Sequence, residues 1–339
     1  MRFRDSLGKM RVIAPERVYA TLEKTVKRPV YRSALSPLLD WRVRRLIVNA
    51  DDFGLTAGVN RAIFEAHTQG IVTSSTLMAT GPAFEDAVRL ANQAPRLSVG
   101  CHVILIDGEP ALDATLLPTI ASKDSGQARF RDGLKSFAAR ALTGRLEAGE
   151  IEAETTAQIR KIQAAGMVVS HVDSHKHTHL FPAVLRPVLA AALACGVRAV
   201  RNPFGPRKPL TPGELLARPS LWTRYAEVRI LRTLSGKFRD AARRRGMATP
   251  DGTLGIVVTG TLDEKLFRSI AAIIPEGTWE FVCHPGYNDA DLQRANTRLR
   301  QSRETELRVL TMPQVKQLLE EQGIALISYH DLISDRNGL

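Results

Sequence analysis

The chain has 339 residues, of which 44% are hydrophobic and 24% are charged, and its formal net charge is +12. This composition is that of a folded globular protein and argues against general disorder. No apolar run approaches the roughly 18–20 residues that span a bilayer, and no apolar segment follows the basic start as in a signal peptide. Three scattered cysteines exclude a disulfide framework and a four-cysteine zinc site, so we expect a soluble, cytoplasmic protein.

The positive charge is concentrated in two segments. Residues 1–45 carry twelve Lys and Arg against four Asp and Glu, and residues 207–247 carry eleven against three. We predict a basic N-terminal extension (1–43) and a catalytic domain (44–339) with a basic helical insertion at about 207–247. The insertion places apolar residues at helical spacing among arginines, which suits either a helix packed on the domain or one at a membrane surface. Solvated surface arginine is the simpler reading, and nucleic acid the less favoured partner.

Strands and helices alternate along the rest of the chain. The first half predicts strands at 45–50, 71–78 and 97–105, helices at 57–70 and 84–94, and a long polar connection over 107–132. Beyond it we predict helices at 133–143, 148–165 and 182–195, and strands at 167–173, 198–201 and near 254–258, 279–283 and 324–328. Repeated strand–helix units favour a parallel sheet or barrel with helices outside.

Four of the eight histidines fall within nine residues, in the run His171-Val-Asp-Ser-His-Lys-His-Thr-His179. If the run stays extended, its histidines and Asp173 share one face, because side chains alternate along a strand. Imidazole is the commonest metal ligand, and carboxylates complete such sites. The spacing predicts a metal site without deciding among His175, His177 and His179.

Polar residues also end the other predicted strands. Asp51 and Asp52 follow the first strand, His102 ends the third, and His284 follows a later one. The carboxyl ends of parallel strands share one rim, so these groups can converge. Adjacent carboxylates point in different directions, so one can bind a metal while the other handles protons. Arg201 follows a short strand, where it either orients a carboxylate or carbonyl or forms a structural ion pair.

Several of these segments resemble one protein family. Leu46-Ile-Val-Asn-Ala-Asp-Asp-Phe-Gly-Leu55, Val99-Gly-Cys-His-Val-Ile-Leu105, the histidine run and Cys283-His-Pro-Gly-Tyr287 are similar, in order, to motifs of the YdjC-type (ChbG/HpnK) carbohydrate deacetylases. The segments Glu304-Thr-Glu-Leu-Arg-Val-Leu-Thr311 and Ile327-Ser-Tyr-His-Asp-Leu332 are also similar. The resemblance covers about residues 44–335. It implies an α/β fold, an irregular (β/α) barrel with parallel strands and outer helices.

The resemblance also implies roles for single residues. The metal ligands carry over to Asp52, His102 and His175, with His179 as the second choice for the last, and the catalytic base carries over to Asp51. His284 matches a histidine that acts on the leaving group or substrate. Arg201, His179 and Tyr287 are our candidate substrate-binding residues.

The expected reaction is metal-assisted hydrolysis that removes the N-acetyl group of an amino sugar, either chitooligosaccharide-like or lipid-linked, and releases acetate. The expected cofactor is one divalent ion, zinc or magnesium. Alternatives are hydrolysis of a different amide or ester on the same barrel and, less favoured, a nucleic-acid- or membrane-binding protein. We also expect a homodimer, a peripheral membrane contact and no nucleic-acid partner.

Overall fold

The computed structural model describes residues 43–124, 126–131 and 133–337. Its centre is a curled parallel sheet in the strand order β6-β3-β2-β1-β8-β7, with β9 paired to β1. The strands of this sheet are β1 (Arg44–Phe53), β2 (Ser74–Leu77), β3 (Ser98–Val103), β6 (Val172–Ser174), β7 (Gly252–Leu254), β8 (Gly277–Cys283) and β9 (Ile324–Ile327). Parallel order and intervening helices are what the sequence predicted.

Isolated β-bridges link β6, at one edge of the sheet, to the segment that precedes β7, at the other edge. Val172 in β6 pairs with Val200, and Ala199 pairs with Ala248 in the segment that leads into β7. Both steps are hydrogen-bonded: the Val172 amide donates to the Ala199 carbonyl, and the Val200 amide donates to the Ala248 carbonyl. The curled sheet is therefore an irregular barrel, and the α/β barrel prediction is confirmed.

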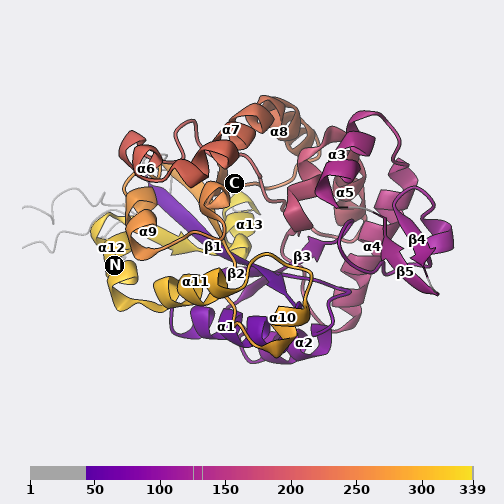
Figure 1. The fold of residues 1–339 in the computed structure, drawn as a ribbon, viewed down its shortest axis with the longest axis horizontal. Helices are drawn as coiled ribbons and strands as arrows, with labels where there is room; N and C mark the ends of the chain where they lie inside the picture. Colours follow the sequence, from indigo (N-terminus) through magenta and orange to yellow (C-terminus); the bar gives the residue numbers. More distant parts are fainter. Residues whose placement is uncertain (1–42, 125, 132, 338–339) are drawn as a thin grey trace, which may run out of the picture. The chain divides into compact units, whose positions relative to one another are not determined.

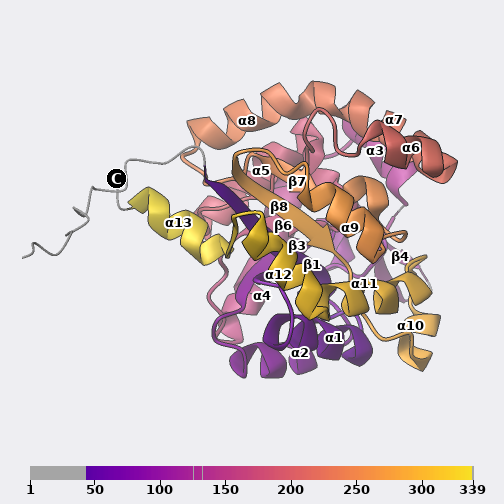
Figure 2. The same cartoon turned by 90° about the vertical axis from the view of Figure 1, so that its left-hand side faces the viewer.

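Helices surround the sheet on its outer side, as Figures 1 and 2 show. In Figure 2, α6, α7 and α8 lie above the strands, α1 and α2 lie below them, and α13 lies at one end. The helices are α1 (Ala57–Thr68), α2 (Phe84–Asn92), α3 (Leu134–Leu142), α4 (Ala148–Ala164), α5 (Pro182–Ala194), α6 (Pro212–Ala217), α7 (Trp222–Leu231), α8 (Ser235–Arg244), α9 (Glu264–Ala271), α10 (Ala290–Arg294), α11 (Gln301–Thr311), α12 (Pro313–Glu321) and α13 (Tyr329–Asn337). Short 3-10 turns are η1 (Ala114–Leu116), η2 (His175–Leu180), η3 (Pro219–Leu221), η4 (Arg232–Leu234) and η5 (Ile256–Val258).

Four predicted elements differ from the structure, one of them the strand predicted at 198–201, which is reduced to isolated bridges at Ala199 and Val200. The connection over 107–132 contains an antiparallel hairpin, β4 (Ala121–Asp124) and β5 (Gln127–Phe130), which its polar composition did not indicate. The strand predicted at 167–173 is reduced to β6, and the one predicted at 254–258 is β7 followed by η5. Strands this short present too few alternating positions for a sequence pattern to locate them.

The segment 207–247, which we predicted to be a basic helical insertion, contains α6, α7 and α8 with η3 and η4 between them. Some of its arginines bond to other parts of the domain. Arg224 donates hydrogen bonds to the Val257 and Thr259 carbonyls, Arg232 donates to the Gly205 carbonyl, and Arg218 pairs with Asp263. The predicted extension, residues 1–43, lies outside the described residues except for Val43. The domain division remains a prediction.

Candidate active site

Asp51 and Asp52 lie in an irregularity near the end of β1. The β1–β2 register pairs Ala50 with Ser75 but Phe53 with Leu77, so β1 carries one extra residue there. Such a bulge changes the direction of side chains. Asp52 also has a φ of 67°, in the left-handed region that non-glycine residues rarely occupy. Because the backbone is distorted here, the two consecutive carboxylates can contact different neighbours. Backbone strain of this kind is typical of functional sites.

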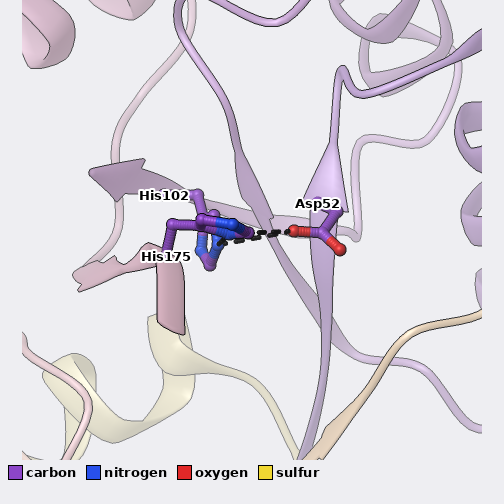
Figure 3. A group of neighbouring side chains, drawn as sticks. All are labelled: Asp52, His102 and His175. Atoms are coloured by element: carbon purple, nitrogen blue, oxygen red, sulfur yellow. Dashed lines mark hydrogen bonds and ion pairs between the residues drawn. The ribbon is translucent and has the colours of Figure 1, made fainter. Parts of the chain in front are cut away.

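Asp52 faces two histidines from neighbouring strands (Figure 3). Its Oδ1 lies 3.6 Å from Nε2 of His102, at the end of β3, and 3.5 Å from Nδ1 of His175, which follows β6. The two imidazole nitrogens are 3.3 Å apart. One carboxylate oxygen and two imidazole nitrogens within 4.8 Å of one another form a group that could hold a metal ion. Asp52 and His102 are buried, and His175 is the member of the group that solvent partly reaches.

Asp173 in β6 orients the His102 ring through the nitrogen that does not face Asp52. Its Oδ1 accepts a hydrogen bond from His102 Nδ1 at 2.8 Å, which leaves Nε2 as the nitrogen that faces Asp52. Burial lowers the pKa of His102, but the carboxylates of Asp173, Asp51 and Asp52 outweigh it and raise the pKa to about 9. In the metal-free protein His102 therefore carries a proton that a bound metal would displace.

Asp51 is held by Arg201. Two guanidinium nitrogens donate to the two Asp51 oxygens at 2.8 and 2.6 Å. Burial raises the pKa of Asp51, but Arg201 outweighs it and holds the pKa below its usual value. The same guanidinium pairs with Asp173 at 2.6 Å and with Glu280 at 2.6 Å, and it is fully buried. Asp51 is thus an oriented anion at neutral pH.

His284 follows β8 and lies near Asp51. Its Nε2 lies 3.9 Å from Asp51 Oδ2, and its backbone N–H donates to Glu306 Oε2 at 2.6 Å. Burial lowers the pKa of His284, although Glu306 and Asp51 act in the opposite direction. A neutral imidazole therefore stands beside the Asp51 carboxylate.

The buried interior around these groups is negatively charged. Five carboxylates (Asp51, Asp52, Asp173, Glu280 and Glu306) accompany two guanidiniums (Arg201 and Arg303). Counting His102 as protonated, the carboxylates exceed the positive charges by two. Buried charge is unfavourable unless it is paired, so this interior attracts a cation.

The model of the protein family described as "YdjC-like protein" matches residues 45–321. The chain belongs to this family. This YdjC-like protein is 32% identical over 289 residues to a carbohydrate deacetylase of Brevibacillus brevis, covering 85% of this chain and 99% of that one. It is 34% identical over 291 residues to a carbohydrate deacetylase of Geobacillus stearothermophilus, covering 85% and 98%.

Two further relatives extend the comparison. The chitooligosaccharide deacetylase of Escherichia fergusonii is 32% identical over 303 residues, covering 85% of this YdjC-like chain and 99% of its own. A solved structure from Enterococcus faecalis, whose name assigns it to cellobiose-phosphate cleavage, aligns with a TM-score of 0.66 and 27% identity. That alignment covers 86% of this chain and 99% of the other.

The histidine run of this YdjC-like protein is not extended beyond Ser174. It enters η2, where Lys176 and His177 have left-handed φ values of 50° and 54°. The shared face that we expected for an extended run is therefore absent. Of the three histidines that spacing left open, His175 lies beside Asp52 and His102.

The other candidate residues lie in different surroundings. His179 is buried, with Nδ1 bonded to Ser174 Oγ at 2.6 Å and Nε2 bonded to the Arg201 carbonyl at 3.2 Å. Its pKa is lowered to about 4, chiefly by burial. Arg201 has no exposed surface, which favours the reading that it orients carboxylates over contact with substrate. Tyr287 is half-buried against α1, where its hydroxyl bonds to Glu65.

Sequence reasoning missed two residues on α11. Arg303 donates a hydrogen bond to Asp52, and Glu306 accepts one from the His284 amide. They lie three residues apart, so both face the barrel from one side of the helix. The segment that resembles the family includes Glu306 and begins one residue after Arg303. That similarity was the available signal, but it indicated no role.

Proposed function

We propose that this protein removes the N-acetyl group from an N-acetylated amino sugar and releases acetate, using one divalent metal ion held by Asp52, His102 and His175. The observation that carries the proposal is the convergence of these three residues beside an ion-paired carboxylate, Asp51. This chain aligns with almost the full length of relatives that are named deacetylases, and their names support the substrate class.

The donor set fits a divalent ion. One carboxylate oxygen and two imidazole nitrogens are a common three-residue set in catalytic metal sites, and the excess of carboxylates favours a cation. Two nitrogen donors suit zinc, while magnesium, manganese and cobalt remain alternatives. When bound, the ion supplies a Lewis acid that polarises the acetyl carbonyl and lowers the pKa of the attacking water from about 15.7 to about 7.

The proton transfers are assigned to Asp51 and His284. Asp51, an anion fixed by Arg201, accepts the proton of the attacking water as its oxygen bonds to the acetyl carbon. Cleavage of the C–N bond requires a proton on the leaving nitrogen. Asp51 supplies it by giving up the proton it took from the water, either directly or through the imidazole of His284, whose Nε2 lies 3.9 Å from Asp51 Oδ2. One water and one amide thus become acetate and a free amino sugar.

The insertion bears on the choice between soluble and lipid-linked sugars. Its helices expose Leu216 (74%), Trp222 (54%) and Ile230 (69%). Exposed apolar side chains among arginines are suited to the interface of an anionic membrane. No helix in the described part of the chain is long and apolar enough to cross a membrane. We therefore propose a lipid-linked amino sugar as the first substrate to test, with a soluble chitooligosaccharide as the alternative.

The test is acetate release from soluble chitobiose and from an N-acetylglucosamine glycolipid in vesicles, before and after chelation and metal add-back. We expect chelation to abolish release and one metal to restore it. Asp52→Ala should lose both metal and activity. Asp51→Asn should keep the metal and lose about 10²–10⁴-fold in kcat, the range for a general base.

The control is Glu152→Gln, the same carboxylate-to-amide change on the exposed face of α4, which should retain wild-type turnover. Near wild-type turnover of Asp51→Asn would refute the assignment of the base. Metal-loaded protein that releases acetate from neither substrate would favour the alternative, a different amide or ester.

A further inference from the structure

The two oxygens of the Asp52 carboxylate have different neighbours. Oδ1 is the oxygen that faces His102 and His175, at 3.6 and 3.5 Å. Oδ2 accepts a hydrogen bond from Nη2 of Arg303 on α11, at 2.5 Å. A guanidinium therefore occupies one side of the carboxylate, and the imidazole nitrogens occupy the other.

Arg303 is held in this place by its own surroundings. The side chain is fully buried, and its Nε donates to the Leu299 carbonyl at 3.0 Å. Its aliphatic stem lies against Gly286, where an added Cβ would come within 2.8 Å of Arg303 Cδ. The Gly286 amide also donates to the Arg303 carbonyl at 3.3 Å. The absence of a side chain at Gly286 thus leaves the space that the arginine stem occupies.

We infer that Arg303 is a positioning residue that occupies Oδ2 of Asp52 and leaves Oδ1 alone to bind the metal ion. The inference rests on the proposed function, because it presupposes that ion. A carboxylate with both oxygens free can bind a cation through either one or both. A second bound oxygen would take a position that a catalytic site keeps open for water or substrate. Hydrogen bonds to a ligating carboxylate commonly determine which of its oxygens binds the metal.

The charge of Arg303 makes this role separable from a merely structural one. A guanidinium beside Asp52 reduces the attraction of that carboxylate for a cation. Removing the positive charge should therefore leave metal affinity undiminished while the metal environment changes. Loss of a residue that only stabilised the fold would weaken metal binding instead.

The experiment is a Co²⁺ titration of the metal-free full chain, followed by visible absorption and by competition with a chelator. We expect Arg303→Gln to bind Co²⁺ with a Kd no weaker than wild type, with an altered visible spectrum and a kcat at least tenfold lower. Arg303→Lys, which keeps the charge, should recover part of kcat. The matched control is Arg308→Gln, an exposed arginine of the same helix, which should match wild type in all three measurements.

A second variant covers the case in which Arg303→Gln does not fold. Gly286→Ala should displace the Arg303 stem and alter the Co²⁺ spectrum in the same direction. A wild-type spectrum in the folded variants, or weaker binding with an unaltered spectrum, would overturn the inference and leave the proposed function intact. A wild-type protein that binds no Co²⁺ would overturn the metal dependence in the proposed function, and this inference with it.

Discussion

Asp173→Asn tests the buried network beneath the candidate metal ligands. Asp173 accepts hydrogen bonds from Arg201 at 2.6 Å, from His102 at 2.8 Å and from Thr76 at 3.1 Å, and all four residues are buried. An asparagine of the same shape removes the charge and turns one acceptor into a donor that faces another donor. Removing one partner of a buried ion pair costs about 3–5 kcal/mol.

We expect a loss near the lower end, about 3 kcal/mol, because Arg201 keeps Asp51 and Glu280 as partners. Metal affinity should fall by about 10–100-fold, the usual effect of losing a residue that orients a ligating histidine. Urea unfolding and Co²⁺ competition measure the two effects. Asp240→Asn on the surface should change stability by less than about 0.5 kcal/mol. An Asp173→Asn protein within that range, with unchanged metal affinity, would refute the reasoning.

The remaining predictions concern pH and packing. The pKa of His102, raised from 6.5 to about 9, implies stability that is fully present below pH 6.5 and lost as the pH rises through about 9. Metal-free wild type should therefore lose up to about 3 kcal/mol of unfolding free energy over that interval relative to His102→Gln, and parallel pH profiles of the two proteins would contradict this. Gly100→Ala should destabilise by about 1–3 kcal/mol in urea unfolding, because its Cβ would meet the buried His171 ring at 2.5 Å. Gly149→Ala, in α4 with open space around it, should be neutral or stabilising, and equal effects of the two changes would refute the packing argument.

The sequence predicted well those features that depend on local pattern. The buried run at 45–50 lies in β1, and the periodic segment at 84–94 closely matches α2. The rule that parallel strands end at one rim grouped Asp51, Asp52, His102 and His284 as candidates. The family resemblance then selected Asp52, His102 and His175, which lie together in the structure.

Features that depend on non-local contacts were not predictable in the same way. The bulge at Asp51 and Asp52 exists only in the register of β1 against β2. The left-handed turn at Lys176 and His177 has no glycine to mark it, so the alternation rule for strands was applied too far. Arg303 lies 251 residues from Asp52 on a helix without a charge pattern that points to it.

The position of β1 also has a consequence for the biosynthesis of the protein. This strand is the first of the described sheet, yet it pairs with β8 and β9, which begin at Gly277 and Ile324. Tyr329, near the end of the chain, stacks on His171 and donates to Glu280, which in turn holds Arg201. A nascent chain on the ribosome cannot complete the pairing of β1, or the support of Asp51 through Arg201 and Glu280, until the segments that contain β8, β9 and Tyr329 have emerged. Such long sequence separations slow folding, so the candidate site is assembled only after most of the described chain has been synthesised.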